Sequence, residues 1–207
     1  MSPQPHTLEA LLTPAEFDPF RRAAAGDPGR LVDLYDWNAQ VGTAFAESLR
    51  YLEVGLRHAL DAAAREHLGD AWLTPHSPFL TRRSRHALDA AQRRARAGAS
   101  RADVLAELPF GFWVALLAEP CKQALWSPAL RFAFPEATRR AHLHRRLQEL
   151  EALNEQITRH APLHERNLLR DYDRVLEVAR LLAPVLEQHL IVTSRVPEVL
   201  FCRPLLT

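Results

Sequence analysis

The sequence predicts an all-α protein, because apolar residues recur at helical spacing and the signals of strands are missing. From Arg30 to about Leu68 no proline interrupts a run in which apolar residues return every three or four positions, which is the spacing of one helix face. No stretch alternates apolar and polar residues over the length of a strand, and no Asn-Gly or Asp-Gly pair offers a hairpin turn. The 207 residues contain no internal repeat and no linker, so we expect a single domain over residues 1–207.

The N-terminal half is expected to consist of an arm followed by one long helix. Residues 1–29 contain five prolines and predict an arm of short helices, with Thr13-Pro14 as a helix start. The helix from 30 to 68 would be roughly 58 Å long at 1.5 Å per residue. We therefore expect it to bend near Gly42 or Gly55, and to end at Gly69-Asp70.

The middle of the chain predicts a loop and several shorter helices. Residues 70–79 form the loop, residues 81–97 read as a basic helix, and Ser100 is a candidate N-cap. The segment 108–118 is apolar on nearly all sides, so we expect it to be buried. Three prolines mark turns around a short helix at 121–126.

Two long helices are expected near the C-terminus. The first spans about 136–159, with apolar residues three, four and seven apart on one face that Asn154 interrupts. The second spans about 164–182, with Leu169 among the residues predicted to face inward. Prolines at 184 and 197 then break the tail into short helical pieces, so a helical core at 30–183 precedes a tail at 184–207.

Composition and charge exclude several classes of protein. No run of 18 uncharged apolar residues exists, so no membrane span is expected, and the lack of an evident signal peptide favours a cytoplasmic protein with two free cysteines. The net charge is only +1, but seven arginines lie between Arg82 and Arg101. Arginine suits contacts with phosphates and bases, so these residues are one candidate for RNA contact. Alternatively, they only solvate a surface, or they reflect a GC-rich genome.

The segment LQELEALNEQITRHAPL, residues 147–163, resembles the signature of the Abi-like proteins, which are bacterial phage-defence (abortive-infection) proteins of the all-α HEPN superfamily. That signature is Arg-Asn-x-x-x-His followed by His-Glu-Pro and an aliphatic residue, and active members of the family are metal-independent endoribonucleases. Without a gap, the catalytic Arg of the family falls on Asn154 and its catalytic His on Arg159, while His160 matches a family position. The resemblance therefore implies a degenerate catalytic motif.

Three further blocks resemble the family in the same order along the chain: residues 34–61, 108–117 and 124–135. The first contains Glu53, Leu56 and Arg57 of a Glu-x-x-Leu-Arg motif, with His58 where Asn is usual. The resemblance implies an HEPN-like helical bundle with one long helix in the N-terminal half and an antiparallel pair of C-terminal helices. It also implies a homodimer whose cleft binds RNA, and it leaves an antitoxin or an RNA as a further partner.

The candidate site residues each have two interpretations. Asn154 and Arg159 either line the cleft and hold RNA, or they make a helix-interface contact and an ion pair with Glu155, respectively. His160 either takes over proton transfer or interacts with the last carbonyls of its helix. Glu53 and Arg57 form a surface ladder with Asp61, or a buried pair in which Glu53 gives structural support, or Arg57 points into the cleft.

Three functions remain open from the sequence. The favoured one is an RNA-associated phage-defence protein that is catalytically degenerate and binds RNA or a partner. The first alternative is an active metal-independent endoribonuclease with a rearranged site around His160, and the second is a helical interaction module without nucleic acid. No cofactor and no metal are expected, because no Gly-rich phosphate loop and no His or Cys cluster with ligand spacing is present.

Overall fold

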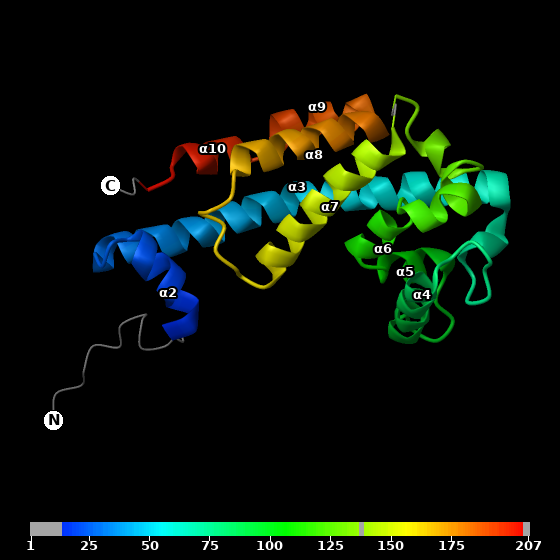
Figure 1. The fold of residues 1–207 in the computed structure, drawn as a ribbon, viewed down its shortest axis with the longest axis horizontal. Coiled ribbons are helices and arrows are strands. Elements are labelled where there is room, and N and C mark those ends of the chain that lie inside the picture. Colours follow the sequence, from blue (N-terminus) through cyan, green and yellow to red (C-terminus); the bar gives the residue numbers. More distant parts are fainter. Residues whose placement is uncertain (1–13, 137–138, 205–207) are drawn as a thin grey trace.

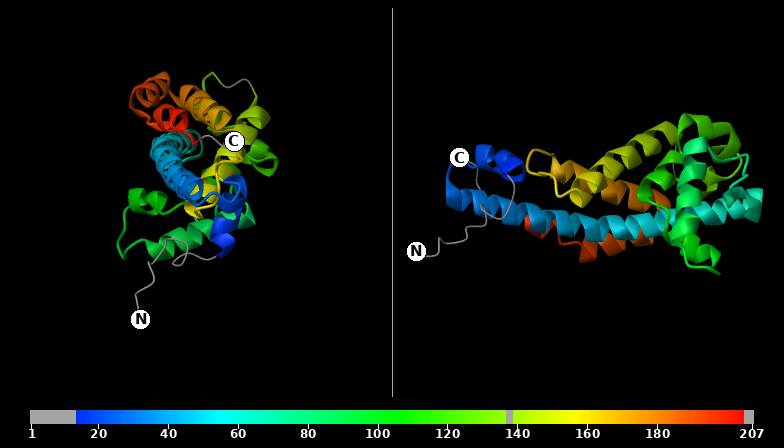
Figure 2. Two further views of the ribbon diagram at one scale, coloured as in Figure 1. Left: turned by 90° about the vertical axis from the view of Figure 1, so that its left-hand side faces the viewer. Right: turned by 90° about the horizontal axis from the view of Figure 1, so that it is seen from below.

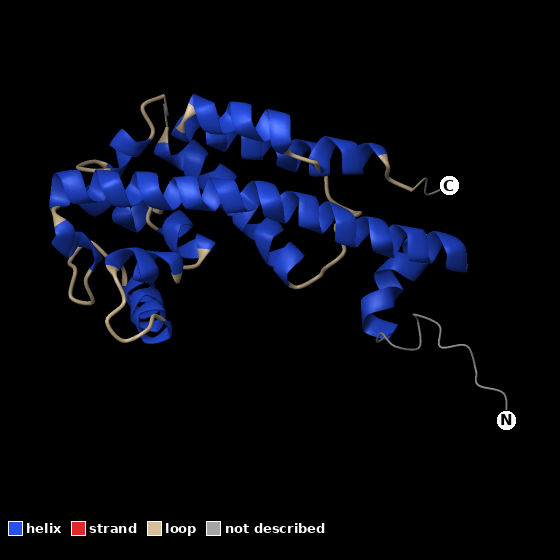
Figure 3. Ribbon diagram, turned by 180° about the vertical axis from the view of Figure 1, so that it is seen from behind, coloured by secondary structure: helices blue, strands red, loops and turns tan. Residues whose placement is uncertain are grey.

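The computed structural model describes residues 14–136 and 139–204, and all regular structure in this part of the chain is helical. No strand occurs in these ranges (Figure 3), so the predicted all-α class is confirmed. The α-helices are α2 (Pro14–Ala23), α3 (Pro28–Leu68), α4 (Arg82–Arg94), α5 (Arg101–Ala106), α6 (Phe110–Ala115), α7 (Arg140–Thr158), α8 (Leu168–Leu182), α9 (Pro184–Thr193) and α10 (Val196–Phe201). Shorter helical turns are Asp70–Leu73, Glu119–Cys121, Lys122–Trp126 and Leu130–Ala133.

Helix α3 is the longest element and the axis of the fold. Its 41 residues span roughly 60 Å at 1.5 Å per residue. The side chain of Asp27 caps the start by accepting from the N–H groups of Gly29 and Arg30, at 2.9 and 3.2 Å. Pro28 in the first turn has no N–H to leave unpaired. The helix ends at Gly69, as predicted.

The two glycines inside α3 allow close packing, and neither interrupts the helix. A Cβ at Gly42 would lie 3.7 Å from Leu163 and 3.9 Å from Ile157. A Cβ at Gly55 would lie 3.2 Å from Leu186 of α9. The segment around the end of α7 and helix α9 can therefore approach the backbone of α3 more closely than larger residues would permit.

The other helices pack around α3 in two groups (Figure 1). Helices α7 to α10 lie along its middle and N-terminal half, whereas α4, α5 and α6 gather at its C-terminal end. Helix α2 packs on the first turns of α3 through Phe17 and Phe20, which contact Tyr35 at ring-centroid distances of 5.0 and 5.2 Å. The right-hand view of Figure 2 shows that α3 runs along the length of the molecule, and the left-hand view looks along the helix.

Charged side chains hold α7 against α8, which run in opposite directions (Figure 1). The buried carboxylate of Asp171 accepts from Arg166 at 2.9 Å and from Arg174 at 2.6 Å. Arg174 also reaches Glu149 of α7 at 2.6 Å. Each charge in this network has a partner of opposite sign, so the network can be buried between the two helices.

The start of α8 differs from the prediction. The helix begins at Leu168 rather than near 164, because the side chain of Asn167 caps it by accepting from the N–H of Arg170 at 3.1 Å. This start places Leu168 in the core, and Leu169 is 67% exposed. The predicted inward orientation of Leu169 is therefore wrong. The expected burial of the segment 108–118 is confirmed, since Phe112, Trp113 and Val114 are almost inaccessible.

Candidate nucleic-acid cleft

A cleft of about 300 Å³ lies between α3 and α7 and brings together three of the predicted site residues. Glu53 and Arg57 of α3 form one wall together with Arg50, and Asn154 of α7 and Phe110 of α6 form the other. Residues 50, 53, 54 and 57 share one side of the helix because they are three or four positions apart. The packing of α3 on α7 thus brings these residues to one place.

Glu53 and Arg57 form an ion pair of 3.0 Å inside this cleft. Their side chains are only 26% and 14% exposed, so the pair is shielded more than a surface pair. The expected ladder with Asp61 is wrong, because Asp61 is buried and accepts from Trp72 at 3.1 Å and from Arg101 at 2.6 Å. Arg57 is both paired and cleft-lining, and its buried Nε has no hydrogen-bond partner among the described residues.

A second hollow of about 350 Å³ adjoins the first, because Asn154 and Phe110 line both. This part is lined by Arg83 and Ser84 of α4, Gly111 of α6, and Glu151 and Glu155 of α7. Burial raises the pKa of the Glu151 carboxyl above its ordinary value of 4.5, Glu155 raises it further, and Arg83 partly offsets both. These two adjoining hollows, called the α3–α7 groove below, therefore hold Arg50 and the Glu53–Arg57 ion pair on the α3 side. On the α4 side they hold Glu151, Glu155 and Arg83.

Arg159 lies outside this groove. It is the C-cap residue of α7, its side chain is 67% exposed, and its Nη2 lies 3.8 Å from Glu155. It lines neither part of the groove. Because Arg159 lies near Glu155 and outside the groove, the structure of the single chain favours the ion-pair interpretation. Such an exposed pair contributes little to stability.

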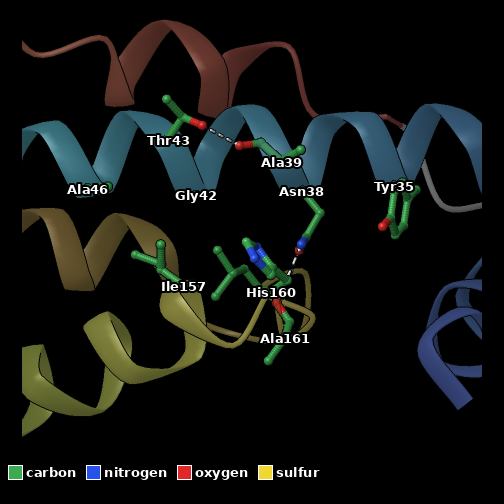
Figure 4. A pocket seen from close by; sticks show the side chains of 10 residues that line it. Tyr35, Asn38, Ala39, Gly42, Thr43, Ala46, Ile157, His160 and Ala161 are labelled. Carbon is green, nitrogen blue, oxygen red and sulfur yellow. Dashed lines mark hydrogen bonds between the residues drawn. The ribbon is translucent and has the colours of Figure 1, made fainter. Parts of the chain in front are cut away.

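His160 lines a different pocket, of about 350 Å³, between α3 and the end of α7 (Figure 4). Its φ of 54° is in the left-handed region. The N–H groups of His160 and Ala161 donate to the carbonyls of Ile157 and Gln156, at 3.0 and 2.9 Å. This is the Schellman pattern that commonly ends a helix, with His160 at the position where glycine is usual. The interaction of His160 with the last carbonyls is thus made by its backbone.

Asn38 of α3 holds the chain just after this turn, and sequence reasoning did not identify it. Its Nδ2 donates to the carbonyl of Ala161 at 3.4 Å, and its Oδ1 accepts from the N–H of Leu163 at 2.7 Å. Both ends of the buried amide are therefore used by the backbone, and Figure 4 shows the contact with Ala161. The pocket at His160 is shaped by this contact and by small residues of α3, namely Ala39, Gly42, Thr43 and Ala46.

The histidines do not assemble into a metal site in the described part of the chain. His164 is buried against Phe20, at a ring-centroid distance of 5.2 Å, and burial lowers its pKa. His142 instead contacts Glu177 of α8 at 3.0 Å. Sequence reasoning also missed Glu151, although its position three residues before Asn154 predicts the same helix face.

Comparison with known proteins does not identify a relative of this chain. No family model, no curated protein and no solved structure matches it. Among the described residues, no helix is both long enough and apolar enough to cross a membrane.

Proposed function

We propose that this chain is an Abi-like phage-defence protein with an HEPN-like helical bundle, and that it binds RNA without cleaving it. The four ordered blocks of sequence resemblance support the family. The long helix α3 and the oppositely running α7 and α8 are compatible with the bundle. The conserved chemistry of active members, as the resemblance implies it, needs an Arg and a His in one cleft.

The observation that carries the proposal is the composition of the α3–α7 groove. It contains Arg50 and the Glu53–Arg57 ion pair, in which the Nε of Arg57 keeps no hydrogen-bond partner among the described residues. The described lining residues include no imidazole. Arginines can hold a phosphate through a fork of N–H donors. The position of the family's catalytic Arg is the uncharged Asn154, and that of its His is the exposed Arg159 outside the groove. The groove thus has the means to bind phosphate and lacks the expected proton-transfer group.

Two partners belong to the proposal, a second copy of the chain and an antitoxin or RNA partner. Helix α9 supports the homodimer, because Val185, Ile191 and Val192 are 76%, 50% and 81% exposed. Apolar side chains gathered on one exposed helix are typical of a protein interface. The antitoxin or RNA partner follows from the resemblance.

An active endoribonuclease that works through His160 is the second candidate. The observation that favours it is the left-handed backbone of this non-glycine residue at the edge of a pocket, because strained residues cluster at functional sites. A helical interaction module without nucleic acid is the third candidate, and the exposed apolar side chains of α9 favour it.

Salt-dependent retention of RNA distinguishes binding from the interaction module. The experiment measures how much labelled single-stranded RNA is retained on a filter by the wild-type protein, by Arg50→Gln and by Arg180→Gln. It is done in EDTA over a range of salt concentrations. Arg50 and Arg180 are both exposed arginines without a hydrogen bond or ion pair to the described residues, and only Arg50 lines the groove. We expect retention by the wild type to fall steeply with salt.

The expected result is a salt slope that decreases by about one unit for Arg50→Gln, since one phosphate contact is lost. Arg180→Gln should behave as the wild type. Equal effects of the two substitutions would show that RNA is held by general charge rather than in the groove. No retention at low salt would contradict RNA binding and favour the interaction module.

A further inference from the structure

Glu151 is a half-buried carboxyl that has no hydrogen bond or ion pair with any described residue. A Cβ at position 111 would collide with its Oε1. Glycine at 111 therefore leaves room for the carboxyl to lie against the first turn of α6. The nearby charges are Glu155, which is unfavourable, and Arg83, which is too distant for an ion pair. Withdrawing a carboxylate from water without a hydrogen-bond donor is unfavourable. The half-buried position of Glu151 is therefore not explained by a contact that stabilises the fold.

The same groove offers chemically different ends to a single ligand. Asn154 and Phe110 line both of its parts, so a molecule bound across them would reach Arg50 and Arg57 at one end and Glu151 at the other. Glu151 and Asn154 are three residues apart on α7 and are neighbours on its surface. The groove thus combines cations for an anionic group with acceptors for a group rich in N–H donors.

A nucleotide of single-stranded RNA has this combination of groups. Its phosphate fits the arginines, and its base can present a Watson–Crick edge to side chains when the strand is unpaired. Guanine offers two neighbouring donors, N1–H and the 2-amino group, which match the two oxygens of a carboxylate in the way a guanidinium fork does. Uracil offers a single donor, N3–H, which lies between two carbonyl oxygens. Those oxygens are repelled by the oxygens of a carboxylate.

We propose that Glu151, with Asn154 beside it, selects guanine over uracil in RNA bound along this groove. The proposal rests on RNA binding as the function of the cleft. Glu151 is a specificity-determining residue here and takes part in no bond-making step. Because its acceptor oxygens need to be unprotonated, selection for guanine should be stronger at neutral than at acid pH.

Pentanucleotides that differ only in the central base test this assignment. The probes are fluorescent UUUUU, UUGUU and the inosine oligonucleotide UUIUU, which lacks the 2-amino group and keeps N1–H. Their binding to the full chain is measured at neutral pH and low salt. Wild-type protein should bind UUGUU about tenfold more tightly than UUUUU, the discrimination expected of one bidentate base contact. UUIUU should lie between them.

The matched variants are Glu151→Gln and Glu66→Gln, which each remove one negative charge. Glu66 is an exposed residue of α3 that lines neither hollow, so Glu66→Gln should keep the guanine preference. Glu151→Gln should reduce the difference between UUGUU and UUUUU to less than about threefold while UUUUU still binds. Thermal unfolding of both variants checks that they are folded.

The outcomes separate this proposal from the function on which it rests. If none of the three oligonucleotides binds, RNA binding itself is contradicted. If all three bind equally to the wild type, or if Glu151→Gln keeps the guanine preference, RNA binding stands and the role of Glu151 is wrong.

Discussion

At the scale of single residues, His160 adopts a backbone conformation that glycine reaches more easily. Its positive φ completes the hydrogen-bond pattern that ends α7. For a residue with a Cβ, the left-handed conformation costs about 1–2 kcal/mol. His160 therefore carries either an uncompensated strain or a function that retains the imidazole.

Replacing His160 by glycine should stabilise the protein. We expect the free energy of unfolding to rise by about 0.5–1 kcal/mol, since relief of strain is partly offset by the greater freedom of glycine in the unfolded chain. Chemical denaturation measures this change. His160→Ala is the control, because it removes the imidazole and keeps the strain, so it should not stabilise. A destabilised glycine variant would indicate favourable contacts of the imidazole.

Glu151 should make stability depend on pH. Its pKa is raised in the folded protein above the ordinary value of 4.5. The folded state therefore binds this proton more tightly, and the resulting stabilisation is present below pH 4.5 and is lost as pH rises through the folded pKa. At neutral pH the charged carboxylate destabilises the fold.

Glu151→Gln should accordingly raise the free energy of unfolding at pH 7, and the gain should shrink as the pH falls toward 4.5. Urea denaturation at several pH values measures it. Glu66→Gln is the control, and a smaller effect is expected because Glu66 is an exposed side chain of α3. If Glu151→Gln were less stable than wild type at pH 7, the carboxylate of Glu151 would have a favourable partner in the folded chain, and the predicted destabilisation by its charge would be wrong.

At the scale of elements, Asn38 connects the middle of the fold to the turn after α7. Its side chain satisfies two backbone groups of residues 161–163. Asn38→Ala leaves the buried N–H of Leu163 without an acceptor, which should cost about 1–3 kcal/mol. Denaturation of Asn38→Ala beside Thr43→Ala, an exposed residue that lines the same pocket, measures this. Equal losses would show that the contact is unimportant.

Helix positions were largely predictable, and the contacts between helices were not. The repeated apolar spacing and Gly69 predicted α3 to within two residues at its start, because both signals are local. The later start of α8 depends on the cap at Asn167, which competes with a pattern that also allows an earlier start. The start therefore depends on which of two local signals prevails, and in the structure it is the Asn167 cap.

The candidate site was predicted only in part, because it depends on contacts between helices as well as on local signals. Arg57 and Asn154, two of the expected cleft residues, line one cleft, and Glu53 pairs with Arg57 there. Of the two interpretations of His160, the structure shows a contact with the last carbonyls of its helix, made by the backbone, and His160 lines another pocket because the helix ends before it and the chain turns. Glu151 looks like an ordinary surface acid in the sequence. Its importance depends on the close approach of Gly111, which comes from a separate helix.

At the scale of the whole molecule, α9 presents apolar side chains that the single chain does not cover. Val192 is 81% exposed. If α9 forms the proposed homodimer interface, Val192→Glu should convert a dimer into a monomer, because an unpaired charge in an apolar interface is unfavourable. Light scattering at micromolar concentration measures the mass.

The control for this prediction is Ala102→Glu, an exposed position on α5 that lies away from α9 (Figure 1). It should leave the dimer intact and unfold within about 0.5 kcal/mol of the wild type, whereas Val192→Glu should stay folded but lose the stabilisation that dimer formation gives. A wild-type protein that is already a monomer would contradict the homodimer. An intact Val192→Glu dimer would place the interface elsewhere.

The central claim is that the α3–α7 groove holds RNA and that the chain does not cut it. The most direct measurement recovers end-labelled single-stranded RNA from the protein-bound fraction in EDTA and resolves it on a denaturing gel, for wild type and His160→Gly. We expect RNA that is bound and full-length with both proteins. Shortened RNA with wild type and intact RNA with His160→Gly would contradict it and establish a nuclease that works through His160.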